Sequence, residues 1–381
     1  MVMGGVEKEL ITVLKELDPS EFETTVLVMY EQDASIMEKI PSWVKVINLN
    51  IDRNFYCADT ITVAKQRIKK GKIFDAFSLI VKKLFKIGQT GSNVNIEDIP
   101  SLDEQYDTAV CYHIHSPLTV KYIAKKVKAK KKVGWIHNDF ATSGYRADKI
   151  KKHLNCYDLF VAVSEKIKLE FLDLCPAYTS KTKTVYNVLN QKEIIDKSLE
   201  PIEEDCFSNN PNGLSLLTVG RLESQKGYDI AIQVAKILKM RGMDFSWCFI
   251  GGGSLETEIN KQILDFDLFD NVKLLGRKEN PYNYMKNCDI YIQPSRHEGY
   301  CLTVYEARIL AKPIVVTNFA GASEQITNGV NGVIVPCNDI EKIANAIMDL
   351  ANNPKQMLEF SRALVDERKH IQGFDEILEC L

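Results

Sequence analysis

The chain has 381 residues, 45% of them hydrophobic and 26% charged, which allows two globular domains of ordinary size, each with its own core. No apolar run reaches the roughly 18–20 residues that a helix needs to cross a bilayer, and no signal peptide opens the chain, so we expect a cytoplasmic protein. The net charge is −3, but residues 1–190 carry +5 and residues 191–381 carry −8. A negative total without a recognised binding module argues against nucleic acid as a partner.

Ten cysteines are scattered singly along the chain, and none forms a CxxC pair. Several of them, such as Cys111, Cys248 and Cys288, lie in apolar runs typical of strands. This distribution favours buried free thiols in a reducing compartment over a disulfide framework or a zinc site.

Short apolar runs alternate with amphipathic helical stretches, a pattern typical of parallel α/β domains. The strands expected in the first half are residues 25–30, 44–48, 108–113, 133–137, 159–164 and 184–188. Those expected in the second half are residues 214–219, 247–250, 272–275, 290–293, 314–317 and 332–335, with helices such as 228–239 and 255–265 between them.

A polar stretch at residues 205–213 indicates a linker between the two halves. The sequence therefore predicts two doubly wound, Rossmann-like domains that face each other across a cleft. We place the first domain at residues 1–205 and the second at 206–381, and we expect the last helix to pack back on the first domain.

The first domain opens unusually. Gly4 and Gly5 form a turn that leads straight into a helix expected at residues 6–17. A doubly wound domain normally places a central strand before such a turn. Either the chain is trimmed at its start or the first sheet lacks an inner strand, and we favour trimming.

The loop after the strand at 214–219 combines two basic residues with glycines. Arg221 and Lys226 can point at one anion, Gly220 allows close backbone approach, and the helix that begins at Tyr228 adds positive potential. A solvated basic loop fits the spacing equally well. The glycine run at 251–253 likewise fits either a ligand or a turn without one, and it is not a GxGxxG motif.

The loop after the strand at 290–293 places Glu298 before a helix that begins near Leu302, and Glu306 lies about one turn into that helix. Free backbone N–H groups at 299–303 suit a phosphate, and two carboxylates suit sugar hydroxyls. By spacing alone, a helix cap and a surface helix residue remain the alternative reading of the two glutamates.

Five sequence blocks stand in order in the second half: GRLESQKG, GGGSLETEI, LLGRKENPYNYMKNCDIYIQPS, HEGYCLTVYEA and AGASEQITNGVNGVIVP. They resemble consecutive blocks of the family-four retaining glycosyltransferases (glycosyltransferase group 1), which have the GT-B fold. The likeness covers nearly the whole second half. The first half is matched more thinly, through MGGVEKELITVLKEL and residues 135–137, 161–164 and 185–187.

The resemblance implies a nucleotide-sugar site. Arg221 and Lys226 would hold the donor diphosphate and stabilise the leaving group. Glu306 would bind the ribose, Glu298 the donor sugar, and His137 would reach that sugar from the first domain. The remaining donor-binding positions would be Gly4, Gly5, Gly220, Gly299, Tyr300, Cys301 and Leu302. The family needs no metal and no cofactor besides the nucleotide sugar, and the chain has no Asp-x-Asp motif.

The other histidines have plainer interpretations. His113 and His115 end a strand and could face the cleft, but they lack a third metal ligand nearby. His297 would orient the loop beside Glu298. We expect His153 and His370 on the surface.

Two basic stretches, residues 65–86 and 125–132, combine lysines with apolar residues. Lysines beside aromatic residues suit an anionic membrane surface, and in related enzymes this domain meets lipid-linked acceptors. A solvated face over an ordinary core stripe is an equal alternative.

The resemblance thus implies a retaining glycosyltransferase that moves a sugar from a nucleotide-diphosphate donor, expected to be a UDP-sugar, to a glycan or lipid-linked acceptor in bacterial surface polysaccharide synthesis. One alternative is an inactive nucleotide-sugar-binding partner of another transferase. Another is an epimerase or a glycan phosphorylase on the same fold.

Overall fold

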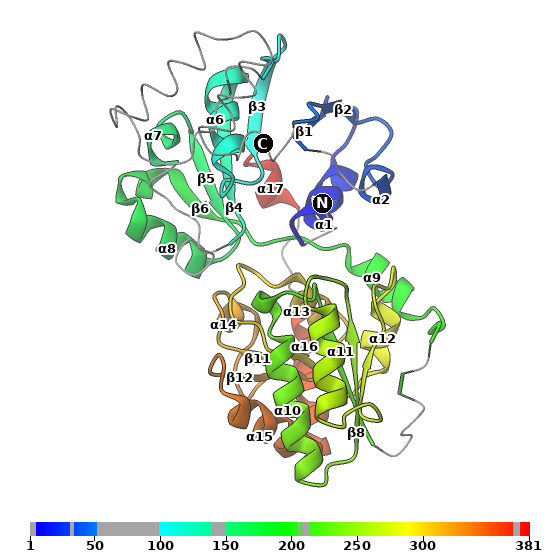
Figure 1. Cartoon of the computed structure of the whole chain (residues 1–381). Coiled ribbons are helices and arrows are strands. Elements are labelled where there is room, and N and C mark those ends of the chain that lie inside the picture. The colour runs from blue at the N-terminus through cyan, green and yellow to red at the C-terminus, as the bar shows by residue number, and fades with distance from the viewer. Residues whose placement is uncertain are drawn as a thin grey trace, which may run out of the picture. The chain divides into compact units, whose positions relative to one another are not determined.

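The computed structural model describes residues 5–30, 34–51, 96, 99–138, 150–204, 206–207, 213–368 and 374–381. The chain forms two compact units (Figure 1). Unit 1 takes Met1–Ala162, Lys168–Val185 and Phe374–Leu381, and unit 2 takes Val163–Ile167 and Tyr186–Gly373. Residues 186–204, which the sequence analysis placed in the first domain, group with unit 2.

Unit 2 is built on a six-stranded sheet in the order β12-β11-β10-β7-β8-β9, with every neighbouring pair parallel. The strands are β7 (Leu214–Val219), β8 (Phe245–Ile250), β9 (Val272–Leu274), β10 (Ile290–Gln293), β11 (Ile314–Thr317) and β12 (Val333–Val335). All residues of β8, β10 and β11 are buried, because helices cover both faces of the sheet.

Successive strand residues feed two separate cores in unit 2. On β7, Leu216 belongs to one core and Leu217 to the other, as the twofold periodicity of a strand requires. One core takes the apolar faces of α10 (Tyr228–Met240), α11 (Glu256–Asp265) and α15 (Ile340–Ala351). The other takes α9 (Gln191–Ser198), α12 (Tyr282–Asn287) and α13 (Leu302–Ile309). Unit 2 is therefore doubly wound.

Sequence signals set the ends of several helices. The Asp339 side chain accepts a hydrogen bond from Lys342 N and so caps α15. Asn353 caps α16 (Pro354–Glu367) in the same way, and Pro354 occupies the first turn, where its missing N–H costs nothing. The remaining short helix of this unit, α14 (Ala322–Gln325), begins after Gly321 in a left-handed conformation.

Within its described residues, unit 1 contains two parallel sheets, not the single sheet that the sequence predicts. A two-stranded sheet joins β1 (Thr25–Val28) to β2 (Lys45–Asn48), and a four-stranded sheet has the order β3-β4-β5-β6. The latter strands are β3 (Gln105–Cys111), β4 (Lys128–Ile136), β5 (Leu159–Ala162) and β6 (Thr182–Thr184). Its described helices are α1 (Gly5–Glu16), α2 (Ala34–Met37), α6 (Pro117–Lys126), α7 (Lys151–Leu154), α8 (Glu165–Leu174), whose first residues group with unit 2, and α17 (Asp375–Leu378).

The C-terminal segment, with α17, belongs to unit 1 and lies between its two sheets (Figure 1). Phe374, Leu378 and Leu381 pack against a small core formed by Leu14, Leu17 and Val44. The carbonyl of Leu381 also accepts a hydrogen bond from Thr108 on β3. The segment thus connects the two sheets of unit 1.

The predicted strand at 184–188 is displaced in the structure. β6 occupies Thr182–Thr184 and pairs with Phe160–Ala162 of β5. Val185 follows β6, is buried, and donates from its backbone N–H to the carbonyl of Ala162 at 2.9 Å. The apolar run at residues 184–188 therefore correctly indicated buried residues. The strand itself is shorter, because its neighbour β5 has only four residues to pair with.

The prediction of free thiols is wrong for one pair of cysteines. Cys206 and Cys248 form a disulfide across 42 residues of sequence. Both are fully buried in the core that α9, α12 and α13 cover. Their spacing carries no signal, because the fold rather than the sequence brings them together. Cys111, Cys156, Cys175, Cys288, Cys301, Cys337 and Cys380 are free, and Cys57 lies outside the described residues.

His153 was expected on the surface, and that expectation is also wrong. Its exposed fraction is 7%, and burial lowers the pKa of its imidazole to about 4. His153 lies in the short α7, which has no periodicity to reveal its buried face. His370 lies outside the described residues. None of the helices in the described ranges is long and apolar enough to span a bilayer.

Candidate active site

The sheet of unit 2 changes direction at one point. From β7 the chain adds β8 and β9 on one side, and from β10 it adds β11 and β12 on the other. Because β7 and β10 are parallel neighbours, the loops that follow them lie side by side at the carboxyl edge of the sheet. In doubly wound sheets this switch point is where ligands bind. Arg221, Lys226 and Glu298 lie on these two loops.

The first loop, residues 220–227, ends in a 3₁₀ turn (Ser224–Lys226) and a left-handed Gly227. Gly227 has φ +70°, and a Cβ there would lie 2.1 Å from the carbonyl oxygen of Pro294. Only glycine permits both the left-handed conformation and this close approach. Gly227 therefore lets the first loop pack directly on the second.

Polar contacts fasten the two loops together. Arg296 forms a bidentate pair with Asp229, with N–O distances of 2.8 and 2.6 Å. Gln225 donates from its side-chain amide to the carbonyl of His297 and accepts from the backbone N–H of Arg296. His297 thus takes part through its backbone. These contacts fix the position of Lys226 relative to Glu298.

Lys226 and Glu298 form an ion pair at 2.6 Å, with side chains only 14% and 8% exposed. Burial alone would lower the pKa of Lys226, but Glu298, with Cys301 nearby, outweighs burial and raises the pKa, while Arg221 opposes that rise. Arg221 itself is exposed at the start of the loop. The pair holds a cation and a carboxylate at the switch point, where an anion and a hydroxylated ligand could each be bound.

A chain of hydrogen bonds from the end of β10 holds the Glu298 carboxylate in place. Ser295 donates to Glu298 Oε1 at 2.7 Å, and the amide of Gln293 donates to Ser295 Oγ at 2.9 Å. Tyr291 and Thr303 both donate to the side-chain oxygen of Gln293. Sequence reasoning missed Ser295 and Gln293. The available signal was their polarity at the end of an otherwise apolar strand.

The second loop leads into α13, whose N-cap residue Cys301 makes no side-chain cap hydrogen bond. The N-terminus of this helix carries backbone N–H groups of the kind that bind an anion. Leu302 begins the helix, and Glu306 lies on its buried face with an exposed fraction of 1%. The surface-residue alternative for Glu306 is thereby excluded.

Gly299 and Tyr300 are held inside unit 2. The carbonyl of Gly299 accepts a hydrogen bond from Ser164 at 3.3 Å. The ring of Tyr300 packs on Tyr186 and Tyr305, with centroid distances of 5.4 and 5.9 Å. This packing fixes the backbone course between Glu298 and α13.

The glycine run at 251–253 has an explanation in packing. A Cβ on Gly251 would lie 1.7 Å from the carbonyl oxygen of Gly220, and one on Gly253 would lie 2.5 Å from that of Leu222. The end of β8 thus presses on the loop that follows β7. These contacts account for the glycines without a ligand.

The predicted site residues of unit 1 lie around a different set of strand ends. His137 directly follows β4, and its ring lies 4.8 Å from that of Tyr112, which follows β3. His115 is buried and His113 half-buried beside them. Gly5 begins α1, and Gly4 lies outside the described residues.

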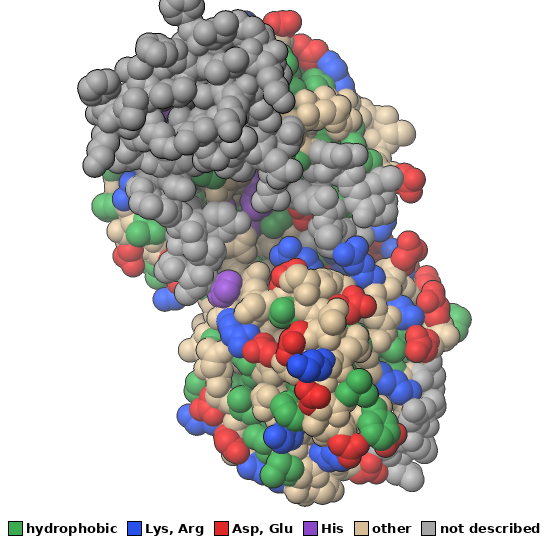
Figure 2. Space-filling model, in the orientation of Figure 1, with side chains coloured by type: hydrophobic (Ala, Val, Ile, Leu, Met, Phe, Trp, Pro, Cys, Tyr) green, Lys and Arg blue, Asp and Glu red, His purple; other side chains and the backbone are tan. Residues whose placement is uncertain are grey.

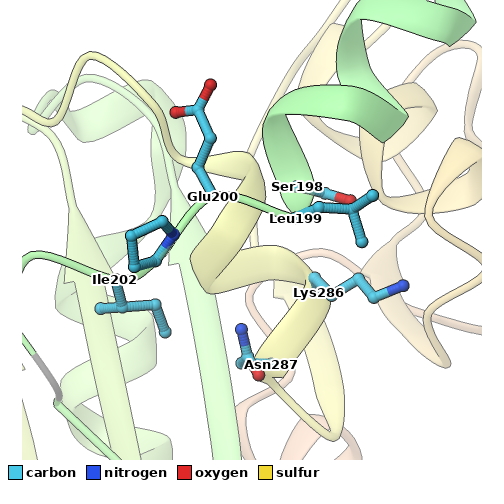
Figure 3. A pocket seen from close by; sticks show the side chains of 7 residues that line it. Ser198, Leu199, Glu200, Ile202, Lys286 and Asn287 are labelled. Atoms are coloured by element: carbon cyan, nitrogen blue, oxygen red, sulfur yellow. The ribbon is translucent and has the colours of Figure 1, made fainter.

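A depression of about 450 Å³ in unit 2 lies between the ends of α9 and α12 (Figure 3). It is lined by residues such as Glu200, Pro201 and Asn287. These groups already bond within the protein: Glu200 and Pro201 accept from Asn280 and Asn283, and Asn287 donates to the carbonyl of Asn283. The depression therefore marks the place where α9 and α12 pack against each other. Elsewhere on the face of unit 2 drawn in Figure 2, acidic and basic side chains are interspersed.

The fold and the switch-point site define an α/β protein of the GT-B class, and comparison with solved structures agrees. HepE of Anabaena in complex with UDP is similar over 99% of this chain and 97% of its own, at 17% identity and a TM-score of 0.65. A TarM mutant of S. aureus is similar over 99% and 96%, at 16% identity and a TM-score of 0.67. Residues 203–364 match the family model of the glycosyl transferases group 1.

Two relatives with assigned roles each match part of the chain. The amylovoran biosynthesis glycosyltransferase AmsK of Erwinia amylovora is 34% identical over 44% of this chain and 45% of its own. The capsular polysaccharide biosynthesis glycosyltransferase CapM of Staphylococcus aureus is 34% identical over 35% and 36%. The chain thus matches less than half the length of either relative.

Proposed function

We propose that this protein is a retaining glycosyltransferase that moves a sugar from a nucleotide-diphosphate donor, a UDP-sugar, to a glycan or lipid-linked acceptor in the synthesis of a bacterial surface polysaccharide. The observation that carries the proposal is the buried Lys226–Glu298 pair at the switch point of a group 1 glycosyltransferase domain. The roles of AmsK and CapM support the polysaccharide context, and the UDP complex of HepE supports the choice of nucleotide.

In this proposal Arg221 and Lys226 bind the diphosphate and neutralise the charge that develops on it as the glycosidic bond breaks. The N-terminus of α13 adds backbone donors to the same phosphates. Glu298 accepts hydrogen bonds from the sugar hydroxyls, and the buried Glu306 accepts them from the ribose. His137 contributes from unit 1 to binding of the donor sugar.

The test is a screen of nucleotide sugars for binding and for turnover by the full chain. We expect one donor to bind and to be hydrolysed slowly or transferred. Lys226→Ala and Glu298→Gln should each lower kcat/KM by about 100-fold, the magnitude typical of a lost electrostatic contact in the transition state.

Lys278→Ala is the matched control. The Lys278 side chain is 15% exposed, and its ammonium lies 3.3 Å from the Glu204 carboxylate, at a position away from the switch point. It should leave kcat/KM unchanged. Equal turnover by Lys226→Ala and the wild type would contradict the transferase proposal. Tight donor binding without any turnover would favour the inactive-partner alternative.

We further propose that residues 65–86 contact an anionic membrane surface, on the evidence of lysines beside aromatic residues. That segment lies outside the described residues. The second basic stretch is a weaker candidate, since Lys130 pairs with Asp107, and Lys131 and Lys132 donate to backbone carbonyls. Neutralising Lys69, Lys70, Lys82 and Lys83 should abolish flotation with anionic liposomes. Unchanged flotation would contradict the membrane contact.

A further inference from the structure

Helix α1 buries a carboxyl group on its apolar face. Glu9 has an exposed fraction of 0% and lies among Ile11, Val13 and Leu14 on the buried side of the helix. Burying a carboxyl in such surroundings is costly unless a partner compensates. A leucine would fill the position at less cost, so the group that Glu9 faces indicates why a glutamate is there.

Glu9 faces the imidazole of His137. Its Oε2 lies 3.3 Å from His137 Nδ1, and the side chains are 1% and 3% exposed. The Tyr112 hydroxyl lies close enough for it and the Glu9 carboxyl to shift each other's pKa, although their geometry falls short of a hydrogen bond. These contacts bring α1 together with the carboxyl ends of β3 and β4, all within unit 1.

The surroundings of the imidazole determine where its proton lies. The backbone carbonyl of Tyr112 accepts a hydrogen bond from the ring. Nε2 is buried and has no hydrogen-bond partner among the described residues, so that bond belongs to Nδ1. Glu9 Oε2 stands on the same side of the ring. The Tyr112 carbonyl accepts the Nδ1 proton, and the Glu9 carboxyl lies 3.3 Å from the same nitrogen without the geometry of a hydrogen bond. Both groups favour the proton on Nδ1 and leave a lone pair on Nε2.

We propose that Glu9 is a positioning residue, which holds His137 as the Nδ1–H tautomer and so presents Nε2 as a hydrogen-bond acceptor to a hydroxyl group of a bound sugar. The identity of that ligand rests on the proposed function. The tautomer does not, because it follows from contacts within unit 1.

The charges nearby agree with a neutral imidazole. Burial, followed by the influence of His113 and His115, holds the pKa of His137 well below its usual range. Burial raises the pKa of Glu9 to about 8, against a smaller opposing effect of Tyr112. At pH 7 the histidine therefore keeps its Nε2 lone pair, which an imidazolium would lack. Above pH 8 the ionised Glu9 would make Nε2 a stronger acceptor.

The first test is independent of any donor. The full chain is labelled with 15N-histidine, and the His137 signals are assigned from the spectrum of His137→Gln. We expect the Nδ1–H pattern in the wild type and in Glu9→Gln, whose side-chain amide keeps a polar oxygen beside Nδ1. In Glu9→Leu and Glu9→Met the pattern should shift toward Nε2–H. An Nδ1–H pattern retained in both apolar variants would overturn the proposal, because the Tyr112 carbonyl would then suffice.

The second test uses the donor found by the screen. Glu9→Leu should lower kcat/KM by about tenfold, within the range typical of groups that orient a ligand-binding histidine, whereas Glu9→Gln should stay within about threefold. In the wild type, kcat/KM should change near pH 8, where Glu9 ionises. This change should be absent from both variants. Glu16→Gln, on the exposed side of α1, is the control. A pH profile of Glu9→Leu identical to that of the wild type would overturn the role in turnover. Absence of turnover in the wild type would count against the proposed function and leave the tautomer result standing.

Discussion

At the scale of single residues, the state of Lys226 depends on what shares its site. Its ammonium is paired with Glu298 at 2.6 Å in a largely buried position. A diphosphate bound at the same loop would give Lys226 a second anionic partner and would weaken its ion pair with Glu298. Glu298 would then rely on Ser295, which donates to the same carboxylate oxygen. The hydrogen-bond chain beneath the site therefore matters most when ligand is bound.

Ser295→Ala tests this dependence. The variant removes the hydrogen bond to Glu298 and leaves the Gln293 amide without its acceptor. We expect kcat to fall about tenfold and the free energy of unfolding to fall by about 1–2 kcal/mol. Steady-state kinetics and chemical denaturation measure the two effects. Ser246→Ala is the control, since Ser246 is buried on β8 but its hydroxyl has no partner among the described residues. Equal kinetics in both variants would contradict the role of Ser295.

Glu9 makes a separate prediction about stability. Its pKa is about 8 in the folded protein, against an ordinary value of 4.5 for a glutamate side chain, so the folded state binds more protons between these values. Stability must then fall as the pH rises from about 4.5 to about 8. We expect Glu9→Leu to gain about 3 kcal/mol over the wild type on going from pH 5 to pH 8. Urea denaturation at both pH values measures this gain. An equal difference at the two pH values would show that Glu9 does not titrate in this range.

At this scale the sequence predicted the charged residues of the site but not the residues that hold them in place. Lys226 and Glu298 lie on two loops whose positions can be predicted from the apolar strands that flank them. Gln293 and Ser295 are polar positions in a buried run, and nothing local distinguishes them from strand-end residues without a role. Glu9 was missed because charged residues on helices are usually exposed.

At the scale of elements, the start of α8 is held by a residue from a distant segment. The Glu324 carboxylate accepts from the backbone N–H groups of Glu165 and Lys166, at 2.7 and 3.0 Å. The Tyr186 hydroxyl donates to the same carboxylate at 3.0 Å. A carboxylate at a helix N-terminus satisfies open donors and complements the helix dipole. Glu324 on α14 thereby ties the turn at residues 163–167 into unit 2.

Glu324→Gln should weaken this attachment. An amide offers one acceptor oxygen and no negative charge, so the two backbone N–H groups and Tyr186 cannot all keep their bonds. We expect the free energy of unfolding to fall by about 1–2 kcal/mol, and amide hydrogen exchange at Glu165 and Lys166 to quicken. Glu359→Gln, an exposed position on α16, is the control. Unchanged exchange in Glu324→Gln would contradict the capping role.

The elements of unit 2 were predictable to within two residues because its strands are buried on both faces and read as continuous apolar runs. The two sheets of unit 1 were not predictable. Strand pairing there involves edges that the hydrophobic pattern does not specify, and the C-terminal segment that connects the sheets comes from the opposite end of the sequence. The Cys206–Cys248 disulfide escaped for the same reason.

At the scale of the whole molecule, the two units have separate cores. Lys226, Glu298 and Glu306 all belong to unit 2, whereas His137 belongs to unit 1. A nucleotide without its sugar should draw its binding energy from the phosphate and ribose groups of the site alone. Such a ligand stabilises the unit that contains those groups, by an amount that depends on its concentration relative to Kd.

We therefore expect two calorimetric transitions, of which UDP raises one. At 100 times Kd, UDP should add about 2.7 kcal/mol to the stability of unit 2 and raise its Tm by several degrees, with little change in the other transition. Cys206→Ala identifies the transition of unit 2, because loss of a disulfide across 42 residues lowers the Tm of that unit alone. Lys226→Ala should abolish the shift that UDP causes. A single transition raised as a whole would mean that the units unfold together, and a rise confined to unit 1 would place the nucleotide away from the switch point of β7 and β10.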